Sequence, residues 1–327
     1  MTPGRPLLTI GVPVFNAERH LRGALDSIQS QTFEEFEVII SDNTSTDRTE
    51  EIARSYVHRD PRFRYRRNRA NLGAARNYNL LFRESSTPYF KWMPHDDIMA
   101  PTYLSQCVAA LDRDPTAVVA TSRVTLIDED GTPADFGRRF REYAARRGLR
   151  HVPVERATRL HSGNPPERFA DVVLRKVWFH EVYGVIRSAA LGRSSLLGLY
   201  TGSCQVMLAE LALLGPFTRI DQELYSCRFP YFYVSDPRSD AVAGKNDPNW
   251  ARRRHFPQAQ VARGYLRAAA RAPTAESRAR CIATVLRKIL EPDNLAKLII
   301  PGPNNYLGLD LARIWRDRSR HEASRAS

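Results

Sequence analysis

Two adjacent carboxylates, Asp96 and Asp97, follow the apolar stretch Tyr89–Met93 and come directly after His95. Neighbouring carboxylates repel each other and lose solvation when they are partly buried. Mg²⁺ and Mn²⁺ prefer hard oxygen ligands, commonly one or two carboxylates together with the phosphate oxygens of a substrate. A bound metal would remove the repulsion and neutralise the charge that develops on a departing diphosphate. The acid pair therefore predicts a divalent-metal site, and the alternative is an acidic turn before a helix.

Three further positions carry groups that suit a nucleotide. His95 adds a nitrogen ligand, which suits Mn²⁺ better than Mg²⁺, or it forms a hydrogen bond beside the site. Asp42 follows another apolar run, where its carboxylate can accept a hydrogen bond from a base or a ribose, and the alternative is a solvated turn residue in Ser41–Thr46. Arg76 and Asn77 fall early in a predicted helix, from which a guanidinium can contact phosphate, and a solvent-facing arginine is the alternative.

The elements that must position these residues alternate along the first hundred residues. Apolar runs predict strands at 7–12, 37–41, 63–66 and 89–93, and apolar residues at helical spacing predict helices after Asn16 and Asp47 and at 71–82 and 102–111. Asn16 is expected to cap the first helix, and Asp47 the second, with Glu50 in a capping box. Crossover-length connections predict a parallel, doubly wound α/β sheet, which binds ligands at the carboxyl ends of its strands.

The pattern is weaker beyond residue 112. It predicts strands at 117–121, 124–127 and 178–186, a turn at 128–131, and helices at 202–214, 258–270 and 275–291. In the last helix Ile282, Val285 and Ile289 are expected to face inward. Residues 137–168 are expected to form a long surface excursion, and residues 228–256 mostly a loop.

Composition narrows the class of protein. The 327 residues are 43% hydrophobic and 26% charged, which is ordinary for a soluble globular protein. The net charge is +13, but the arginines are spread among acids and no nucleic-acid-binding spacing occurs, so we expect no nucleic-acid partner. Four scattered cysteines without a C-x-x-C pair favour a reduced, cytoplasmic setting. No apolar run reaches the length of a spanning helix, and the first residues lack the apolar region of a signal peptide.

Three segments together resemble a family 2 glycosyltransferase of the GT-A fold. They are VPVFNAERHLRGALDSIQSQTFEEFEVIISDNTSTDRTEEI, NRANLGAARNYNLLF and YFKWMPHDDIMAPTYL, and the resemblance is specific over residues 7–112. It continues more weakly through FHEVYGVIRSAAL and GSCQVMLAELALLGPF to about residue 228. The resemblance implies transfer of a sugar, with inversion, from a nucleotide-diphosphate donor to an acceptor. Mn²⁺ or Mg²⁺ is the implied cofactor, and UDP or dTDP is the expected nucleotide by family habit.

The resemblance also assigns residues by position. Those implied to contact the nucleotide are Pro13, Phe15, Asn16, Asp42, Asn71, Arg76 and Asn77. Asp96 and Asp97 are implied to form the DXD-type metal and diphosphate site, which makes Asp97 a catalytic candidate. His95 is a common residue before such a pair.

Two departures from the family pattern fall in the second half of the chain. Relatives usually carry an acid, the expected general base, where this chain has Cys204, and a neutral thiol is a poor substitute for a carboxylate. Relatives also often carry a histidine where this chain has Phe229. Three explanations stay open. Glu181 or Glu210 is the base, although Glu210 fits a structural helix acid better; or the acceptor, being anionic or a free amine, needs no base; or the protein binds a nucleotide sugar without standard transfer.

A nucleotidyltransferase is the nearest other class of enzyme. It needs a Gly-rich loop with a lysine after the first strand, and Pro13–Asn16 supplies neither. We therefore predict a nucleotide-sugar-binding half at 1–112, an acceptor-binding half at 113–256, and a C-terminal helical extension with a frayed tail at 257–327. The expected acceptor is a saccharide or a small natural product. A homodimer and a peripheral contact between the C-terminal helices and an anionic membrane stay open.

Overall fold

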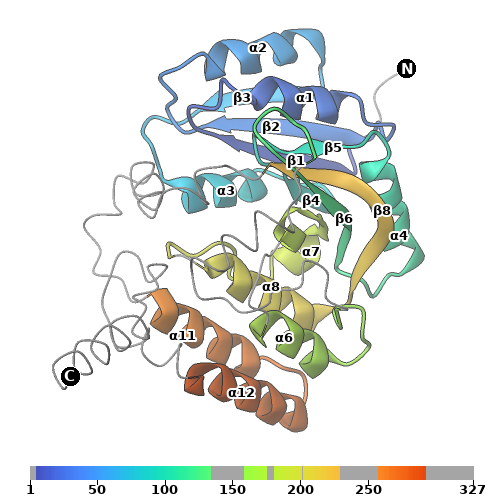
Figure 1. Cartoon of the computed structure of the whole chain (residues 1–327), viewed down its shortest axis with the longest axis vertical. Helices are drawn as coiled ribbons and strands as arrows, with labels where there is room; N and C mark the ends of the chain where they lie inside the picture. Colours follow the sequence, from blue (N-terminus) through green and yellow to red (C-terminus); the bar gives the residue numbers. More distant parts are fainter. Residues whose placement is uncertain (1–4, 134–157, 175–179, 201, 229–256, 292–327) are drawn as a thin grey trace, which may run out of the picture.

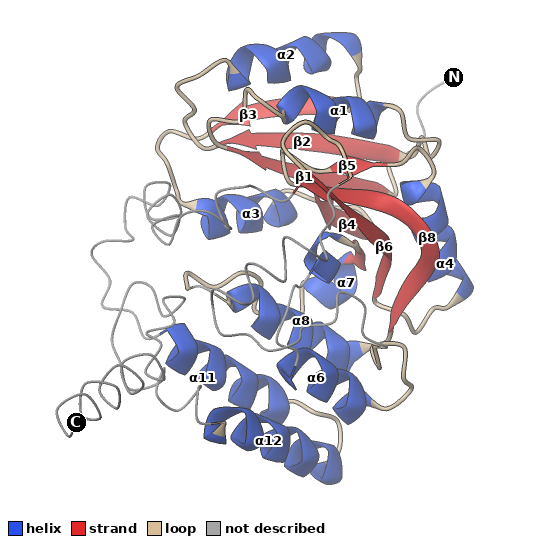
Figure 2. Cartoon of the chain, in the orientation of Figure 1, coloured by secondary structure: helices blue, strands red, loops and turns tan. Residues whose placement is uncertain are grey.

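The structure, a computed structural model, describes residues 5–133, 158–174, 180–200, 202–228 and 257–291. Eight strands form one mixed sheet in the order β3-β2-β1-β4-β7-β6-β8-β5, with helices on both faces (Figure 1, Figure 2). The strands are β1 (Leu8–Val14), β2 (Phe36–Asp42), β3 (Phe63–Arg67), β4 (Tyr89–Trp92), β5 (Ile98–Met99), β6 (Val119–Ile127), β7 (Val185–Arg187) and β8 (Phe217–Arg228). The helices are α1 (Leu21–Gln29), α2 (Thr49–Arg59), α3 (Ala74–Arg83), α4 (Tyr103–Arg113), α6 (Pro165–Leu174), η1 (His180–Tyr183, a 3₁₀ helix), α7 (Ser188–Leu191), α8 (Ser203–Leu214), α11 (Pro257–Ala270) and α12 (Ala275–Leu290).

The first four strands form the parallel part of the sheet. β1 pairs with β2 and β4, and β2 pairs with β3, all in the parallel sense. Every residue of β1 is buried, as expected for a strand that helices cover on both faces. The carboxyl ends of these strands therefore lie along one edge of the sheet, as the sequence predicts.

Two apolar clusters hold the helices on the two faces. On one face α1, α2 and α4 pack on the sheet through a cluster that includes Leu25 and Tyr56. On the other face α3, α6, α8, α11 and α12 share a cluster that includes Phe90, Trp92 and Phe169. In the view of Figure 1, α11 and α12 lie at the end of the molecule farthest from α1 and α2.

The strand β8 brings the second half of the chain to the acid pair. It pairs in parallel with β6 and antiparallel with β5, the two-residue strand that directly follows Asp97. A register shift between Ser122 and Val124 distorts the β6–β8 pair, as a bulge does. The end of β8 thereby carries Tyr225 and Arg228 to the edge where β4 ends.

Several local predictions are wrong. α1 begins at Leu21, and Asn16 does not cap it because its backbone is left-handed (φ 49°) and its side chain bonds to the next loop. α2 begins at Thr49 with Arg48 at the N-cap position, so Asp47 is not the cap, although it accepts a hydrogen bond from the Thr49 N–H. The side chain of Glu50 bonds to Arg54 and does not close a capping box. In the described part of the strand expected at 178–186, residues 180–183 form η1 and only residues from Val185 on form a strand, β7.

Other predictions hold or need a smaller correction. The helices expected at 202–214, 258–270 and 275–291 are confirmed, whereas the two strands expected at 117–127 are the single strand β6. In α12 Val285 is buried as predicted, but Ile282 is 37% exposed and Cys281 occupies the buried position. Of the surface excursion predicted at 137–168, residues 137–157 lie outside the described residues, and the prediction is wrong for 165–168, which begin the helix α6. Residues 229–256 of the predicted loop also lie outside the described residues. None of the helices described is long and apolar enough to cross a membrane.

An arginine joins loops at the end of the sheet opposite to the acid pair. Arg187 ends β7 and lies across from Tyr89, the first residue of β4. Its Nε donates to the Ala117 carbonyl (2.8 Å) and its Nη2 to the Leu111 carbonyl (2.7 Å). Arg187 therefore stabilises the fold far along β4 from Asp96 and Asp97.

A glycine lets α3 approach the sheet closely. A Cβ at Gly11 would lie 2.9 Å from the Leu81 Cβ and 3.0 Å from the Phe90 Cζ, closer than side-chain atoms pack. We expect Gly11→Ala to lower the free energy of unfolding by about 1–3 kcal/mol, because the core must move to admit the methyl group. Denaturant unfolding followed by circular dichroism measures the change.

Gly23 in α1 is the matched control. A Cβ there would have no atom within 4 Å, so Gly23→Ala is expected to raise the free energy of unfolding by about 0.5–1 kcal/mol through helix propensity. Equal effects of the two substitutions would contradict the close approach of α3 to β1.

Candidate functional site

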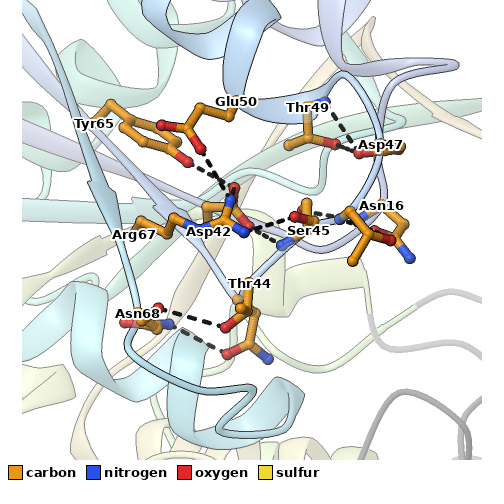
Figure 3. Close-up of polar contacts among 12 residues, drawn as sticks. Asn16, Asp42, Thr44, Ser45, Asp47, Thr49, Glu50, Tyr65, Arg67 and Asn68 are labelled. Carbon is orange, nitrogen blue, oxygen red and sulfur yellow. Dashed lines mark hydrogen bonds and ion pairs between the residues drawn. The ribbon is translucent and has the colours of Figure 1, made fainter.

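The loops that follow β1 and β2 are locked together at the carboxyl edge of the sheet (Figure 3). The Asn16 N–H donates to Ser45 Oγ (2.9 Å), and the Thr46 N–H donates to Asn16 Oδ1 (2.9 Å). Asn16 and Thr44 both have a positive φ, at 49° and 72°. Such backbone is uncommon for residues other than glycine and persists where neighbours hold it, often at functional sites.

Asp42 is the buried anchor of this loop pair. Its Oδ1 accepts the Ser45 N–H (2.7 Å), and its Oδ2 accepts the Tyr65 hydroxyl (2.6 Å) and an Arg67 guanidinium N–H (3.2 Å) (Figure 3). Burial and the carboxylate of Asp42 raise the pKa of Tyr65 well above its ordinary value, so the phenol stays protonated as the donor. The carboxylate therefore shapes the loop on which a nucleotide would rest.

Asparagine side chains connect this loop to α3. Asn77 is buried and bonds through both amide atoms to Ser41, accepting its hydroxyl (2.6 Å) and donating to its carbonyl (2.9 Å). Asn71 Oδ1 accepts the side-chain amide of Asn43 (2.6 Å). Both predicted nucleotide contacts thus also hold the loops in place. Arg76, in contrast, is exposed, and the structure records no polar partner for it within the described part of the chain.

The remaining predicted residues after β1 differ in what they can offer. Pro13 is buried within β1. Phe15 is half-buried and packs into neither of the two apolar clusters found in the described residues. An aromatic ring at the binding edge that is not used by the core can stack on a base or a sugar.

Asp97 is nearly inaccessible at the end of β4, with an exposed fraction of 2%. Its Oδ2 accepts the Tyr225 hydroxyl (2.7 Å), and its Oδ1 accepts the main-chain N–H of Arg228 (2.9 Å). Burial raises the pKa of Asp97 to about 6, the charge of Asp96 adds to the rise, and the two hydrogen bonds oppose it. The Cys227 thiol also forms a hydrogen bond with this carboxylate, which still leaves lone-pair capacity for a further partner.

Asp96 is the more accessible member of the pair. It is half-buried, and its carbonyl accepts a hydrogen bond from Arg228 Nε (3.0 Å). Its carboxylate has no hydrogen bond or ion pair among the residues that the structure describes. His95, also half-buried, precedes it.

These donors fit a cation that is shared with a substrate. No group of three His, Cys, Asp or Glu side chains suited to a metal occurs in the described ranges. One free carboxylate and a second with spare lone pairs fit the manner in which Mg²⁺ or Mn²⁺ is held by one or two carboxylates plus substrate phosphates.

A fully buried lysine lies in β4 behind the acid pair. Lys91 Nζ donates to the carbonyl of Tyr183 in η1 and lies 4.8 Å and 4.6 Å from the ring centroids of Tyr103 and Tyr225. Burial lowers the pKa of Lys91 to about 7, and the charges of Cys107 and Asp97 oppose that shift. The lysine joins β4 to the segment that precedes β7.

The base candidates of the second half are placed as follows. Cys204 is half-buried in the first turn of α8, and burial raises the pKa of its thiol, so the thiol is protonated near neutral pH. Glu210 accepts the Ser195 N–H (2.6 Å) and an N–H of Arg271 (3.3 Å), which fits the structural role. Glu181 is buried in η1. Phe229 lies outside the described residues.

Tyr183 lies in η1, and its carbonyl accepts the hydrogen bond of Lys91. The pKa of its phenol is raised well above the ordinary value, first by Tyr78, then by burial, and the charge of Asp97 adds to the rise. The phenol of Tyr183 therefore stays protonated near neutral pH.

Comparison with known proteins identifies the family from the same part of the chain. The profile described as Glycosyl transferase family 2 matches residues 9–195. The chain belongs to this family. An uncharacterized glycosyltransferase of Rickettsia typhi is 34% identical over 125 residues, which are 38% of this chain and 38% of that protein. The chain thus matches well under half of the length of this curated relative.

Solved glycosyltransferases share the fold. TarS of S. aureus in complex with UDP superposes with a TM-score of 0.57 at 16% identity, over 86% of this chain and 71% of that chain. The mannosyltransferase PcManGT of Pyrobaculum calidifontis, in complex with GDP-Man and Mn²⁺, has a TM-score of 0.53 at 17% identity, over 90% and 72% of the two chains. These comparisons confirm the predicted GT-A fold and the predicted family.

Three residues beside the acid pair, Tyr225, Arg228 and Lys91, are not among those predicted from the sequence. Tyr225 and Arg228 reach the acid pair because they lie at the end of β8. The sequence does not predict β8, because the polar run Asp221–Glu223 interrupts its apolar pattern. Lys91 carries a visible signal, since a lysine inside the apolar run Tyr89–Met93 must be buried if that run is a core strand.

The buried lysine predicts a pH dependence of stability. The folded pKa of Lys91, about 7, lies below its ordinary 10.5, so between these values the unfolded chain holds a proton that the folded protein has lost. The free energy of unfolding then rises with pH. We expect wild type to gain about 2 kcal/mol relative to Lys91→Met between pH 7 and pH 9. Urea unfolding at several pH values measures this.

Lys288→Met, on the half-buried side of α12, is the control. Its unfolding free energy should run parallel to that of wild type across the same pH range. If Lys91→Met also runs parallel to wild type, Lys91 is charged in the folded protein and this interpretation of its burial is wrong.

Proposed function

We propose that this family 2 protein transfers a sugar from a nucleotide-diphosphate donor to a saccharide or small-molecule acceptor, with a divalent cation and with inversion. The observation that carries the proposal is the accessible carboxylate of Asp96 beside the anchored Asp97. It lies at the edge where the locked loops after β1 and β2 also end. We expect the nucleotide of the donor to be UDP or dTDP. TarS, which has the same fold, binds UDP.

The residues divide the work in the following way. Asp96 and Asp97, with His95 beside them, would hold Mn²⁺ or Mg²⁺, which when bound neutralises charge on the leaving diphosphate. Arg76 offers an exposed guanidinium to a phosphate or base, and Phe15 offers a ring face for stacking. Asp42, Asn71 and Asn77 hold the loops in the binding conformation and offer the nucleotide their remaining hydrogen-bond capacity.

The acceptor step differs from that of a carboxylate-based transferase. A protonated Cys204 does not remove a proton from a hydroxyl near neutral pH. The oxygens of Glu210 are already bound to Ser195 and Arg271. We infer that either Glu181 is the base or the acceptor arrives as an anion or a free amine. The same observations favour the second candidate function, binding of a nucleotide sugar without transfer.

A thermal-shift panel tests the donor site. UDP, dTDP, GDP and ADP are each added with Mn²⁺ and with a chelator, and binding raises the melting temperature by mass action. We expect one or two diphosphates to give a shift that depends on Mn²⁺. Asp96→Asn should weaken that Mn²⁺-dependent binding at least about tenfold, or ~1.4 kcal/mol.

Asp221→Asn is the control, because Asp221 on β8 is an exposed acid whose ion pair among the described residues is a long one, to Arg123 (3.8 Å). It should retain the full shift. The donor-site proposal is contradicted if no diphosphate shifts the wild-type melting temperature, or if Asp96→Asn behaves as Asp221→Asn does.

Substitution of Cys204 separates the acceptor explanations. We expect Cys204→Ser to change donor turnover, measured as release of nucleoside diphosphate from the sugar donor that the panel identifies, by no more than about twofold. The reason is that a protonated thiol contributes no base. A loss of tenfold or more in Cys204→Ser, with nucleotide affinity unchanged, would make the thiol a catalytic group. No turnover in wild type, with intact nucleotide binding, would support the binding-only function.

A further inference from the structure

Arg228 contacts both members of the acid pair and a distant turn. It is the last residue of β8, and its exposed fraction is 9%. Its main-chain N–H donates to Asp97 Oδ1 (2.9 Å), and its Nε donates to the carbonyl of Asp96 (3.0 Å). Its Nη1 donates to the carbonyls of Asp128 and Glu129, the latter at 2.8 Å. One residue thus holds the Asp96 carbonyl and the Asp97 carboxylate after β4, and two consecutive carbonyls of the distant turn.

The side-chain contacts of Arg228 are carbonyl oxygens. Such a fork of donors to separate carbonyls sets backbone geometry, because each N–H has a fixed direction in the planar guanidinium. The direction of the Asp96 carboxylate depends on the peptide units that flank it. An arginine that holds the Asp96 carbonyl therefore fixes the direction of the Cα–Cβ bond from which that carboxylate projects.

The turn held by Arg228 continues to the loop after β1. Within it the Gly131 N–H donates to the Asp128 carbonyl (3.1 Å). Glu129 Oε2 pairs with Arg19 Nη1 (2.8 Å) and with His20 Nε2 (3.2 Å), just before α1. The pKa of His20 is lowered by burial and by the charge of Arg228, so the guanidinium acts on this loop as well. A continuous set of contacts thus runs from the acid pair, through Arg228 and the turn, to the β1–α1 loop.

We propose that Arg228 is a positioning residue for the metal-dependent binding of the donor diphosphate. It orients the Asp96 carboxylate through the Asp96 carbonyl and holds the 128–131 turn against the β1–α1 loop. This inference rests on the proposed function of the acid pair. It assigns to Arg228 no contact with the substrate.

Arg187 is the matched control for Arg228, because its guanidinium makes the same kind of hydrogen bonds but lies far from the acid pair. It also donates through Nε and a terminal nitrogen to carbonyl oxygens, those of Ala117 and Leu111, but at the opposite end of β4. Loss of either fork leaves buried carbonyls without donors, so Arg187→Gln and Arg228→Gln should both destabilise the fold. Only Arg228→Gln should change the response of nucleotide binding to metal.

The experiment compares UDP affinity in Mn²⁺ with UDP affinity in a chelator, by calorimetry, well below the melting temperature of each variant. The ratio of the two affinities is the metal increment, and GDP and dTDP are used in the same way. We expect an increment of at least tenfold in wild type and in Arg187→Gln. In Arg228→Gln and in the milder Arg228→Lys, which keeps the charge but loses the planar fork, we expect it to fall at least fivefold.

Each result decides one statement. An increment that stays within twofold of wild type in both Arg228 variants overturns the positioning role while the donor site stands. An equal fall in Arg187→Gln overturns it as well, because general destabilisation then explains the loss. If wild type shows no increment with any of the three diphosphates, the proposed function itself fails. If Arg228→Gln does not fold, Arg228→Lys alone decides the comparison.

Discussion

The hydrogen bonds to the buried carboxylate of Asp97 are the interaction on which the site depends. Asp97 follows the parallel strand β4 and directly precedes β5, yet the donors Tyr225 and the Arg228 peptide come from β8. A buried carboxylate without donors is costly, so the end of β8 must stay beside β5 for the fold to be stable. Because β8 stays in this position, the backbone of Asp96 is also fixed, while the Asp96 carboxylate remains accessible. In the acid pair, Asp97 is therefore held by hydrogen bonds, while the carboxylate of Asp96 is accessible to a ligand.

Lys91 adds a second link of the same kind. It also belongs to β4, and its ammonium donates to Tyr183 of the second half and lies between two tyrosine rings. The predicted boundary near residue 112 therefore marks no break in the sheet, because β4 pairs directly with β7. The first and second halves of the chain are therefore joined through buried polar contacts at β4, the strand that precedes the acid pair. Such contacts are specific in geometry, which suits a site that must align two substrates.

The sequence predicts much of the fold and less of the site. Strands and helices of the first hundred residues follow apolar periodicity, which is strong because parallel strands are buried on both faces. The helix start at Leu21 was not predictable from Asn16, since tertiary bonds to the loop after β2 override its capping preference. β8 was hidden because its middle is exposed and polar.

Residue types at the site were easier to predict than their roles. Asp42 ends β2 and Asn77 lies early in α3, but their burial and their bonds to the chain itself are not visible in local sequence. The departure at Cys204 was visible as a residue type, and its raised pKa follows from burial in the first turn of α8. Positions such as Arg228 act through carbonyl groups, which carry no sequence signal at all.

The central claim is that a cation joins the acid pair after β4 to the diphosphate of an activated sugar. A crystal structure of this chain with UDP and Mn²⁺, with data collected for the anomalous signal of manganese, tests it most directly. The account predicts a manganese peak in contact with the Asp96 carboxylate and the diphosphate oxygens, while Asp97 keeps Tyr225 and Arg228 as donors. Bound UDP with no manganese peak there, or with the diphosphate directed away from Asp96, would contradict it.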